Sequence, residues 1–559
     1  MKCVKCHKLL LNSQDIITNK LRFMKKFTRL FASLLILLMV AAACSKDSYD
    51  PKVTPSPTPS GGGEDTPTQP TTSTEIQYAT MFARDVLSTY YLWEGEIAGA
   101  IENELNPSTC TDPVSTVEKI RYKEGGGYDA GKDEDRWTRL FPDASEFIDG
   151  LAGVENTHGM SVTVGEFTGT NPVEYFLIVN FLYEGSPAAK TGIKRGDVII
   201  SFNGKSITDA NVRNAYYGWD TATYGLGEFT KDGIRDTGEE VTITPSKMYL
   251  NPIICHKTFD VNGKKVGYLM YDGFDLDGCE QLVQISKQFK SEGVKELILD
   301  MRYNGGGYVF TENFLASLLA PKANVDAGDL YMTEVYNKDL DEYWSKSNKD
   351  YNKTFFTWKH EVSIEDSDGN AHDYKFNTAN ANIGLEKIYG IVSSGTASAA
   401  ESILVGLNPY LDITTIGKQS HGKYCTGTIF VPYTENEISA VGFYTERIPE
   451  IEKWGMYCMI ATYADRDGKN MARPVGIVPD IEASDYFNDA GEYVVFDIGD
   501  ENEPMLQKAL MAAGKKFTTV ATTRSLNAMP QFNTKQLEDG HRFGMRVMLP
   551  PMKPGKAIE

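Results

Sequence analysis

The stretch Lys387-Ile-Tyr-Gly-Ile-Val-Ser393 continues directly into Ser394-Gly-Thr-Ala-Ser-Ala-Ala-Glu401. The first segment is a short apolar run bounded by polar residues, which predicts a buried strand. Apolar residues at helical spacing from Ala399 to Leu407 predict an amphipathic helix immediately afterwards. Ser398 therefore lies at a strand-to-helix turn, where its hydroxyl is expected to be exposed and neighbouring backbone N–H groups can face a developing oxyanion.

Lys423 follows Ser398 by 25 positions, after the apolar run Leu411–Ile416 and within the glycine-containing turn Ser420-His-Gly-Lys423. A lysine amine that is shielded from water can lose its proton near neutral pH and act as a general base. Taken alone, the serine could cap a helix and the lysine could be a solvated turn residue. Their spacing favours a catalytic pair, with His421 as the rival base.

A second glycine-rich turn follows another predicted strand. The run Glu296–Asp300 leads into Met301-Arg-Tyr-Asn-Gly-Gly-Gly307, and a helix is expected from about Thr311. Glycines after a strand let the backbone approach a substrate closely, and the helix adds a positive dipole near the turn. We expect this turn and the turn at Ser398 to face each other, so that one supplies the serine and the other an oxyanion donor.

The chain has 559 residues, which is too long for one core and predicts two or three domains. Its composition is that of a globular protein, with 41% hydrophobic and 24% charged residues. The net charge of −20 argues against nucleic acid or an anionic membrane surface as partner. Because no metal-ligand cluster, nucleotide loop or cofactor motif occurs in the sequence, we expect neither a metal nor a cofactor.

Changes of pattern along the chain predict a multidomain α/β protein. The tail after about residue 520 has weak periodicity and is expected to be loosely ordered. The predicted segments are a leader and signal (1–44), a flexible linker (45–75), an N-terminal helical domain with an aromatic core at Tyr90–Trp93 (76–150), a β-rich domain (155–250), an α/β domain (255–485) with an insertion (324–385), and a C-terminal extension (486–559).

The N-terminus is typical of an export signal. The basic segment Met24-Lys-Lys-Phe-Thr-Arg29 precedes the apolar run Leu30–Ala43, which is too short to span a bilayer comfortably. Ala41-Ala-Ala-Cys44 resembles the lipobox of a bacterial lipoprotein, with alanine where leucine is usual. The resemblance implies cleavage before Cys44, lipid on its thiol, and a bacterial cell-envelope location on the periplasmic face or the outer-membrane surface. An uncleaved anchor or a buried helix is the alternative.

The β-rich segment contains Gly185-Ser-Pro-Ala-Ala-Lys-Thr-Gly-Ile-Lys-Arg-Gly-Asp-Val-Ile-Ile-Ser-Phe-Asn-Gly204. This pattern predicts a strand, a short helix, a glycine-ended turn and a second strand with a tight Asn-Gly turn. It closely resembles a PDZ domain of bacterial proteases. Such domains add a C-terminal peptide to a sheet edge and hold its carboxylate on backbone amides. The resemblance puts the carboxylate loop near His158-Gly159-Met160; a structural β-domain without peptide affinity is the alternative.

Four motifs together resemble the tail-specific, or C-terminal-processing, serine peptidases. They are Asp300-x-Arg302-x-Asn304-x-Gly306-Gly307, the Thr-Ala-Ser-Ala-Ala-Glu stretch around Ser398, Gly422-Lys423, and Gly476-Ile-Val-Pro-Asp480. The resemblance covers roughly residues 76–515 and implies a crotonase-like (ClpP/crotonase) α/β catalytic domain that contains a serine peptidase site. The implied substrates are proteins or peptides bound by their C-terminal tails.

The resemblance also implies a role for each matching residue. Ser398 is the implied nucleophile and Lys423 the general base, while the oxyanion hole is formed by the N–H of Ala399 and by a glycine N–H from Gly305–Gly307, for which Gly306 is favoured. The residues implied to fix the glycine turn are Asp300, Arg302, Asn304, Gly305 and Gly307.

One position departs from the family pattern. Many members carry a glutamine four residues after the lysine, where it helps to orient the amine, and this chain has Gly427 there. Thr426, Thr428 or a water molecule could take over that role. The departure keeps open a second hypothesis, a catalytically weak or inactive lipoprotein that binds peptide tails. A third hypothesis is a cell-surface protein that handles host or glycan-bound peptides.

Overall fold

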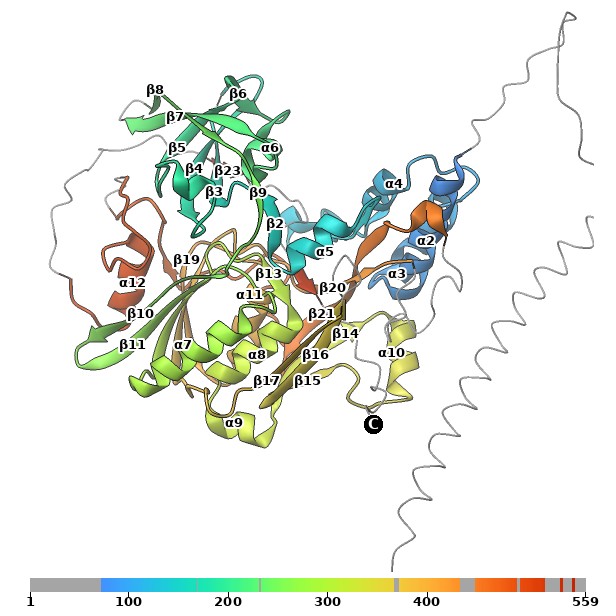
Figure 1. The fold of residues 1–559 in the computed structure, drawn as a ribbon. Helices are drawn as coiled ribbons and strands as arrows, with labels where there is room; N and C mark the ends of the chain where they lie inside the picture. The colour runs from blue at the N-terminus through green and yellow to red at the C-terminus, as the bar shows by residue number, and fades with distance from the viewer. Residues whose placement is uncertain are drawn as a thin grey trace, which may run out of the picture. The chain divides into compact units, whose positions relative to one another are not determined.

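The computed structural model describes residues 72–167, 169–230, 233–365, 371–432, 448–489 and 493–517, with the short segments 533–535 and 545–547 (Figure 1). The predicted leader and signal, Cys44 and most of the linker 45–75 lie outside the described residues. Within the described part of the chain, every helix is too short or too polar to traverse a bilayer.

Helices dominate the first described segment. They are α2 (Thr74–Tyr90), α3 (Glu94–Glu104), α4 (Pro113–Ile120) and α5 (Ser145–Leu151), with a 3₁₀ turn at Tyr128–Ala130 and strand β1 (Arg139–Phe141) between α4 and α5. The Ser73 side chain caps α2 by accepting from the Ile76 N–H, and Asp112 caps α4 in the same way. Tyr90, Tyr91 and Trp93 are buried in one core, as the predicted aromatic core requires.

An antiparallel sheet forms the β-rich segment. Its order in the described part of the chain is β23-β3-β4-β6-β5-β7-β8, in which β23 comes from the C-terminal tail. Alternate residues of β4 face opposite sides: Leu177 and Val179 enter one core, and Phe176 and Ile178 another. The elements are β3 (Met160–Glu166), β4 (Glu174–Leu182), β5 (Val198–Phe202), β6 (Lys205–Thr208), α6 (Val212–Tyr217), β7 (Ala222–Thr230), β8 (Gly233–Ile243) and β23 (Asn533–Lys535), with β2 (Val154–Thr157) paired to β9 (Ser246–Tyr249) beside them.

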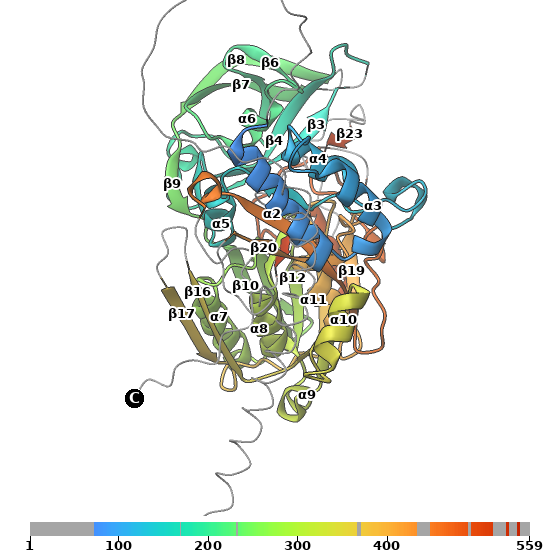
Figure 2. The same ribbon diagram turned by 90° about the vertical axis from the view of Figure 1, so that its right-hand side faces the viewer.

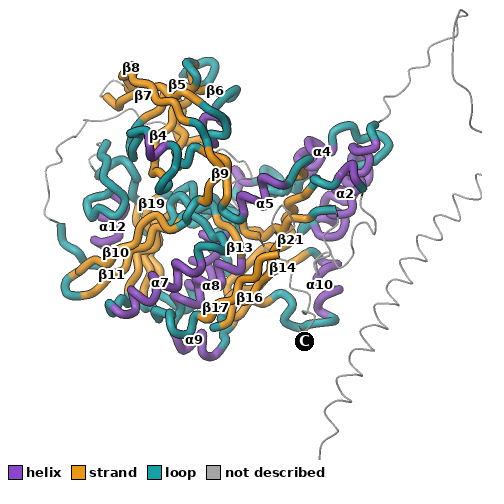
Figure 3. Tube along the Cα trace, in the orientation of Figure 1, coloured by secondary structure: helices purple, strands orange, loops and turns teal. Residues whose placement is uncertain are grey.

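The α/β segment is built on the sheet β10-β11-β12-β18-β19-β22, in which β11, β12, β18, β19 and β22 run parallel. Leu297 and Leu299 of β12 face α7, α8 and α11, whereas Ile298 faces α12, so helices cover both faces (Figure 3). The elements are β10 (Ile253–Val261), β11 (Lys264–Tyr271), α7 (Cys279–Ser291), β12 (Glu296–Asp300), α8 (Val309–Leu319), α9 (Lys322–Ala327), β18 (Lys387–Val392), α11 (Ala399–Leu407), β19 (Asp412–Gly417), β22 (Ile481–Glu482) and α12 (Pro504–Ala512).

A second sheet lies beside the first, with the order β13-β24-β20-β21-β14-β15, and β1 pairs with β21. Strand β14 belongs to residues 324–385, the predicted insertion, and it pairs with β21 inside this sheet. The elements are β13 (Gly306–Tyr308), β14 (Leu330–Tyr336), α10 (Lys338–Ser345), β15 (Lys353–Phe355), β20 (Cys425–Phe430), β21 (Gly455–Asp465), β24 (Met545–Val547), a 3₁₀ turn at Pro449–Ile451 and the separate hairpin β16 (Lys359–Glu365) and β17 (Ala371–Asn377).

Parallel pairing brings three turns to one edge of the first sheet. Asp300 at the end of β12 pairs with Ile391, and Val392 at the end of β18 pairs with Gly417 at the end of β19. Because the carboxyl ends of parallel strands meet at one edge, the segments that follow these strands lie together. These segments carry the glycine turn, Ser398 and Lys423.

Candidate active site

Ser398 stands at the N-terminal end of α11, in the turn that follows β18. Its φ is +62°, a value that residues other than glycine adopt infrequently. The residue is fully buried, and its Oγ has no hydrogen-bond partner among the described residues. The predicted strand–turn–helix setting is confirmed, whereas the expected exposure of the hydroxyl is wrong for this structure.

Lys423 lies between β19 and β20 and is fully buried. Its Nζ donates a hydrogen bond to the Tyr457 hydroxyl at 2.9 Å. The same atom lies 4.8 Å from the Tyr457 ring centroid and 5.5 Å from the Trp137 ring, where the aromatic faces attract a cation. Since Ser398 Oγ bonds to no described group, the serine and lysine side chains are not hydrogen-bonded to each other here.

A buried carboxylate joins the two motifs. Glu401 Oε2 accepts hydrogen bonds from the backbone N–H groups of Ser398 and Lys423, both at 2.9 Å. Its Oε1 accepts from the Gly422 N–H at 2.7 Å and from the Ser420 hydroxyl at 2.5 Å. Burial raises the pKa of Glu401, and these four donors act in the opposite direction. The Ser-x-x-Glu spacing of a capping box is a local signal for the contact between Glu401 and Ser398, but no local signal indicates the contacts of Glu401 with Ser420, Gly422 and Lys423.

The three turns are tied together by hydrogen bonds. The Ala397 N–H donates to the Asn304 carbonyl at 3.0 Å, and the Thr396 hydroxyl donates to the Met301 carbonyl at 2.8 Å. The His421 N–H donates to the Thr396 carbonyl at 2.9 Å. The glycine turn and the serine turn are therefore neighbours, as predicted.

The glycine turn owes its shape to close contacts. Gly307 has a φ of +142°, and a Cβ there would lie 2.5 Å from the Phe274 carbonyl oxygen, so only glycine fits. The Gly306 N–H, one predicted oxyanion donor, donates to Asn304 Oδ1 at 2.8 Å in this structure. Ala399, the other predicted donor, is the first residue of α11, where helix N–H groups lack intrahelical acceptors. Gly305 is buried between Asn304 and these glycines.

A buried network of charges supports the same turn. Arg302 Nη2 donates to Asp300 Oδ2 at 2.7 Å, and Arg302 Nη1 donates to Glu503 Oε1 at 2.6 Å. Asp300, Arg302 and Glu503 are almost completely buried. On the other side of the turn, Asn304 Nδ2 donates to the Tyr271 carbonyl at 2.8 Å. These contacts fit the structural role that the resemblance implied for Asp300, Arg302 and Asn304.

The family of the α/β segment follows from comparison of its sequence with family models. Residues 265–483 match Peptidase family S41, and residues 178–213 match a PDZ domain. Residues 265–483 form a peptidase family S41 domain. The multidomain α/β fold and the family predicted from the four motifs are thereby confirmed.

Curated relatives of the S41 domain are named carboxyl-terminal-processing proteases. The protein of Picosynechococcus sp. is 29% identical over 155 residues, which cover 27% of this chain and 37% of that protein. The protein of Synechocystis sp. is 22% identical over 280 residues, which cover 48% and 56%. The matches thus span between about a third and just over half of the relatives' length.

A solved structure of an S41 protease from Bacteroides fragilis has the same fold. It covers 77% of this chain and 96% of its own, with a TM-score of 0.54 and 20% sequence identity. At that identity the likeness extends to the fold alone.

His421, the rival base in the S41 domain, contacts Trp137 of the helical segment. Trp137 Nε1 donates to His421 Nε2 at 3.4 Å, and both residues are buried. The sequence gives no signal for the contact between Trp137 and His421, because a local pattern cannot indicate that two residues so far apart in the chain meet in the fold.

The predicted peptide-binding residues of the PDZ domain divide into two kinds. The His158 ring is held by the Tyr224 hydroxyl at 2.9 Å and by the Asp220 carbonyl at 2.8 Å, and burial lowers its pKa. The Gly159 carbonyl accepts from the Tyr183 N–H at 3.0 Å. His158 and Gly159 are thus built into the domain, whereas Met160 begins β3 and lines a cleft.

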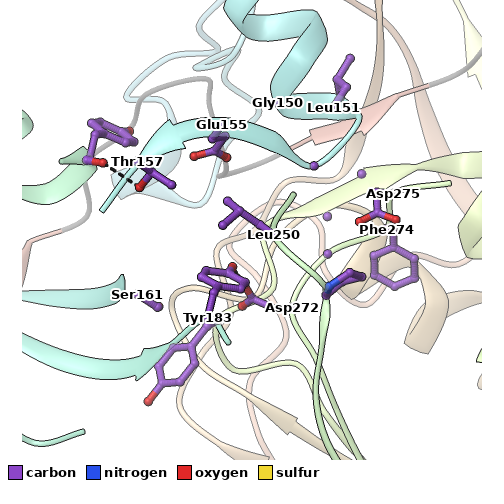
Figure 4. Close-up of a pocket in the computed structure, with 18 of the residues that line it drawn as sticks. Gly150, Leu151, Glu155, Thr157, Ser161, Tyr183, Leu250, Asp272, Phe274 and Asp275 are labelled. Carbon is purple, nitrogen blue, oxygen red and sulfur yellow. Dashed lines mark hydrogen bonds between the residues drawn. The ribbon is translucent and has the colours of Figure 1, made fainter. Parts of the chain in front are cut away.

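This cleft runs from the PDZ domain to the S41 glycine turn (Figure 4). Met160, Ser161 and Val162 of β3 line it together with Gly305, Gly306 and Gly307. Figure 4 shows Glu155 and Thr157 on β2, and Asp272 and Asp275 on the loop after β11. Burial raises the pKa of Asp275 to about 7. A chain bound to β3 can therefore reach the glycine turn through one continuous cleft.

Tyr457 is the residue that sequence analysis missed at Lys423. Its ring passes over Gly427, where a Cβ would lie 2.6 Å from the ring carbon Cζ. Gly427 thus leaves room for the phenol that contacts the lysine amine. Thr426 does not take this role here, because its hydroxyl donates to Glu334 at 3.0 Å.

Proposed function

We propose that this chain is a serine endopeptidase that hydrolyses peptide bonds of unfolded or tail-presented proteins, with Ser398 as nucleophile and Lys423 as general base. The observation that carries the proposal is that Glu401 Oε2 lies 2.9 Å from the backbone nitrogen of Ser398 and 2.9 Å from that of Lys423. One buried carboxylate keeps the two residues side by side. Removal of Lys423 from water favours the neutral amine that a general base requires, and the Trp137 and Tyr457 rings favour the ammonium that forms when the base takes a proton.

In the proposed reaction, Ser398 Oγ attacks the substrate carbonyl carbon while the neutral amine of Lys423 takes the hydroxyl proton. The step requires the serine hydroxyl and the lysine amine to rotate towards each other. The tetrahedral oxyanion would be held by the Ala399 N–H and by the Gly306 N–H, once Gly306 releases Asn304 Oδ1.

The second half of the reaction restores the enzyme. The Lys423 ammonium gives its proton to the leaving amine as the C–N bond breaks, which leaves an acyl ester on Ser398. A water molecule then attacks the ester, Lys423 takes the proton of that water, and Oγ recovers a proton when the ester bond breaks. Atoms and charges balance without a metal or cofactor.

The proposed substrates are protein tails. A PDZ domain adds an extended peptide to a sheet edge, and the cleft from β3 to Gly306 connects that edge with the glycine turn that carries a proposed oxyanion donor. The carboxyl-terminal-processing names of the relatives agree with this substrate class. We further propose that lipid on Cys44 holds the enzyme at the bacterial cell envelope.

A serine-directed acylating probe tests the proposal. We expect the probe to label Ser398, as mapped by mass spectrometry, and casein to be cleaved by the wild type but not by Ser398→Ala or Lys423→Ala. Cleavage should rise from acid to alkaline pH over roughly pH 5 to 9, because the lysine base must be neutral. A flat pH profile would argue against the lysine.

Ser402→Ala is the matched control, because Ser402 is a buried serine on the same helix whose hydroxyl donates to the Ala399 carbonyl. This variant should keep its cleavage activity. Negligible cleavage by the wild type and by Ser398→Ala alike, with tight binding of peptide tails, would instead support the inactive binding protein that the glycine at position 427 first suggested.

A further inference from the structure

Two short strands of the C-terminal tail pair with the two domains that form the proposed substrate path. The first, β23, runs antiparallel to β3 at the edge of the PDZ sheet (Figure 2). Asn533 pairs with Glu166, Thr534 with Gly165, and Lys535 with Val164. This register carries the tail along β3 towards Met160, the end that lines the cleft.

The second strand, β24, lies between β13 and β20 of the S41 domain. It runs parallel to β13, with Met545 opposite Gly306 and Val547 opposite Tyr308, and Val547 also pairs with Gly427 of β20. Neighbouring strands lie about 4.8 Å apart, so β13 and β20 stand two such spacings from each other, which leaves room for one extended chain. The tail fills that slot.

The slot adjoins the proposed catalytic groups. Gly306, one predicted oxyanion donor, belongs to β13, and Lys423 is separated from the start of β20 by Tyr424 alone. Ser398 is fully buried, and its Oγ has no partner among the described residues. A nucleophile that is covered but unbonded is what an occupied, unreactive site predicts.

The two strands are close enough along the chain to follow one path. Strand β23 ends at Lys535 and β24 begins at Met545. Residues of β3 and of the glycine turn line a single cleft. A continuous chain that pairs first with β3 and then with β13 thus follows the route proposed for a substrate.

We propose that the edge of β3 and the slot between β13 and β20 form one track for an extended polypeptide, and that strands β23 and β24 of the chain's own tail occupy this track and inhibit the enzyme. The inference rests on the proposed peptidase function. A substrate tail would compete with β23 and β24 for the same backbone hydrogen bonds. The full-length chain is then partly inhibited, and a substrate that displaces the two strands is cleaved.

Proline substitutions in the full-length chain test the inference. Arg546→Pro removes a backbone N–H donor from β24. Because β24 is paired on both sides, its position is that of a central strand, where proline is poorly tolerated. We expect kcat/KM for a fluorogenic peptide to rise roughly fivefold or more, because one net backbone hydrogen bond corresponds to a factor of about five. Amide exchange in residues 306–308 and 425–430 should accelerate as well.

Thr534→Pro and Lys535→Pro apply the same test to β23. Successive N–H groups of a strand face opposite sides, so one of these two variants removes a donor to β3 and the other is its matched control. We expect faster exchange in residues 160–166 and higher kcat/KM for one variant of the pair. Thr523→Pro, which lies in the same tail outside both strands, should match the wild type.

A synthetic peptide of residues 533–547 completes the experiment. It should inhibit Arg546→Pro competitively and restore slow exchange in residues 306–308. Unchanged exchange and unchanged kcat/KM in every proline variant would overturn the inference. If no variant shows cleavage that depends on Ser398, the peptidase proposal fails, and the exchange data, measured also in Ser398→Ala, still decide whether the tail occupies the track.

Discussion

The side chain that holds the Lys423 amine comes from a neighbouring strand. Tyr457 on β21 accepts the hydrogen bond from Nζ, and Gly427 on β20 provides the space for its ring. In the family resemblance this task belongs to a glutamine at the position of Gly427. The space that a side chain at position 427 would need is therefore taken by the Tyr457 ring.

Tyr457→Phe removes the hydroxyl and keeps the ring over Gly427. We expect kcat to fall roughly tenfold, because the hydrogen bond that orients the lysine amine is lost, and the alkaline rise of the pH–rate profile to shift. Steady-state kinetics from acid to alkaline pH measure both effects.

Tyr463→Phe is the matched control for this prediction. Tyr463 is also a buried tyrosine beside Lys423, but its hydroxyl donates to the lysine's backbone carbonyl at 3.0 Å. This variant should lose some stability and leave the pH profile in place. Equal profiles for the two phenylalanine variants would contradict a positioning role for Tyr457.

Helix α11 and strand β20 hold the site together as elements. The first turn of α11 presents Glu401 to the turn that precedes β20, so the helix and the strand share one buried carboxylate. The strand in turn leaves no room for a side chain at its third residue, where a Cβ would lie 2.4 Å from Met459 Cε and 2.6 Å from the Tyr457 ring.

Gly427→Gln restores the residue that the family pattern expects, and it should nevertheless harm this protein. The new side chain must displace the Tyr457 ring, and overpacking of this kind costs about 1–3 kcal/mol of unfolding free energy. Gly427→Ala should cost less, because it adds only the Cβ. Urea denaturation followed by tryptophan fluorescence measures the series. A glutamine variant as stable as the wild type would show that the ring can move freely.

At the scale of the whole molecule, buried charges connect the PDZ domain to the S41 domain. Arg195 of the PDZ domain donates to Asp485 at 2.6 Å, and Arg302 beside the glycine turn donates to the same carboxylate oxygen at 2.8 Å. Although burial alone would raise it, the pKa of Asp485 is lowered to about 2 by Arg195 and Arg302. Glu503, which caps α12, completes the network through Arg302.

Arg195→Gln should destabilise the link between the domains and make it more sensitive to acid. The folded-state pKa of Asp485 lies below its ordinary 3.8. The ionised carboxylate therefore contributes its full stabilisation of the folded state above pH 3.8, and this stabilisation is lost as the pH falls towards about 2. Loss of Arg195 raises that folded-state pKa, so the variant should unfold at higher pH. We also expect a loss of about 3 kcal/mol near neutral pH, typical of a broken buried ion pair.

Lys190→Gln controls for the change of charge, since Lys190 is an exposed lysine of the same domain. Denaturant titrations across a pH series measure both variants. An acid transition of Arg195→Gln that coincides with those of the wild type and Lys190→Gln would contradict the coupling.

Local patterns in the sequence were enough to identify strand Glu296–Asp300, helix Ala399–Leu407 and the motifs around Ser398 and Lys423, because apolar periodicity and turn glycines act over a few neighbouring residues. They could not identify Tyr457, Trp137 or Arg195 as partners of the site. Those contacts depend on strand order and register, which bring together side chains from separate segments of the chain. For the same reason, the weak periodicity of the tail predicted loose order and gave no indication of its two strands. Its strands β23 and β24 exist through hydrogen bonds with edges that other parts of the chain supply.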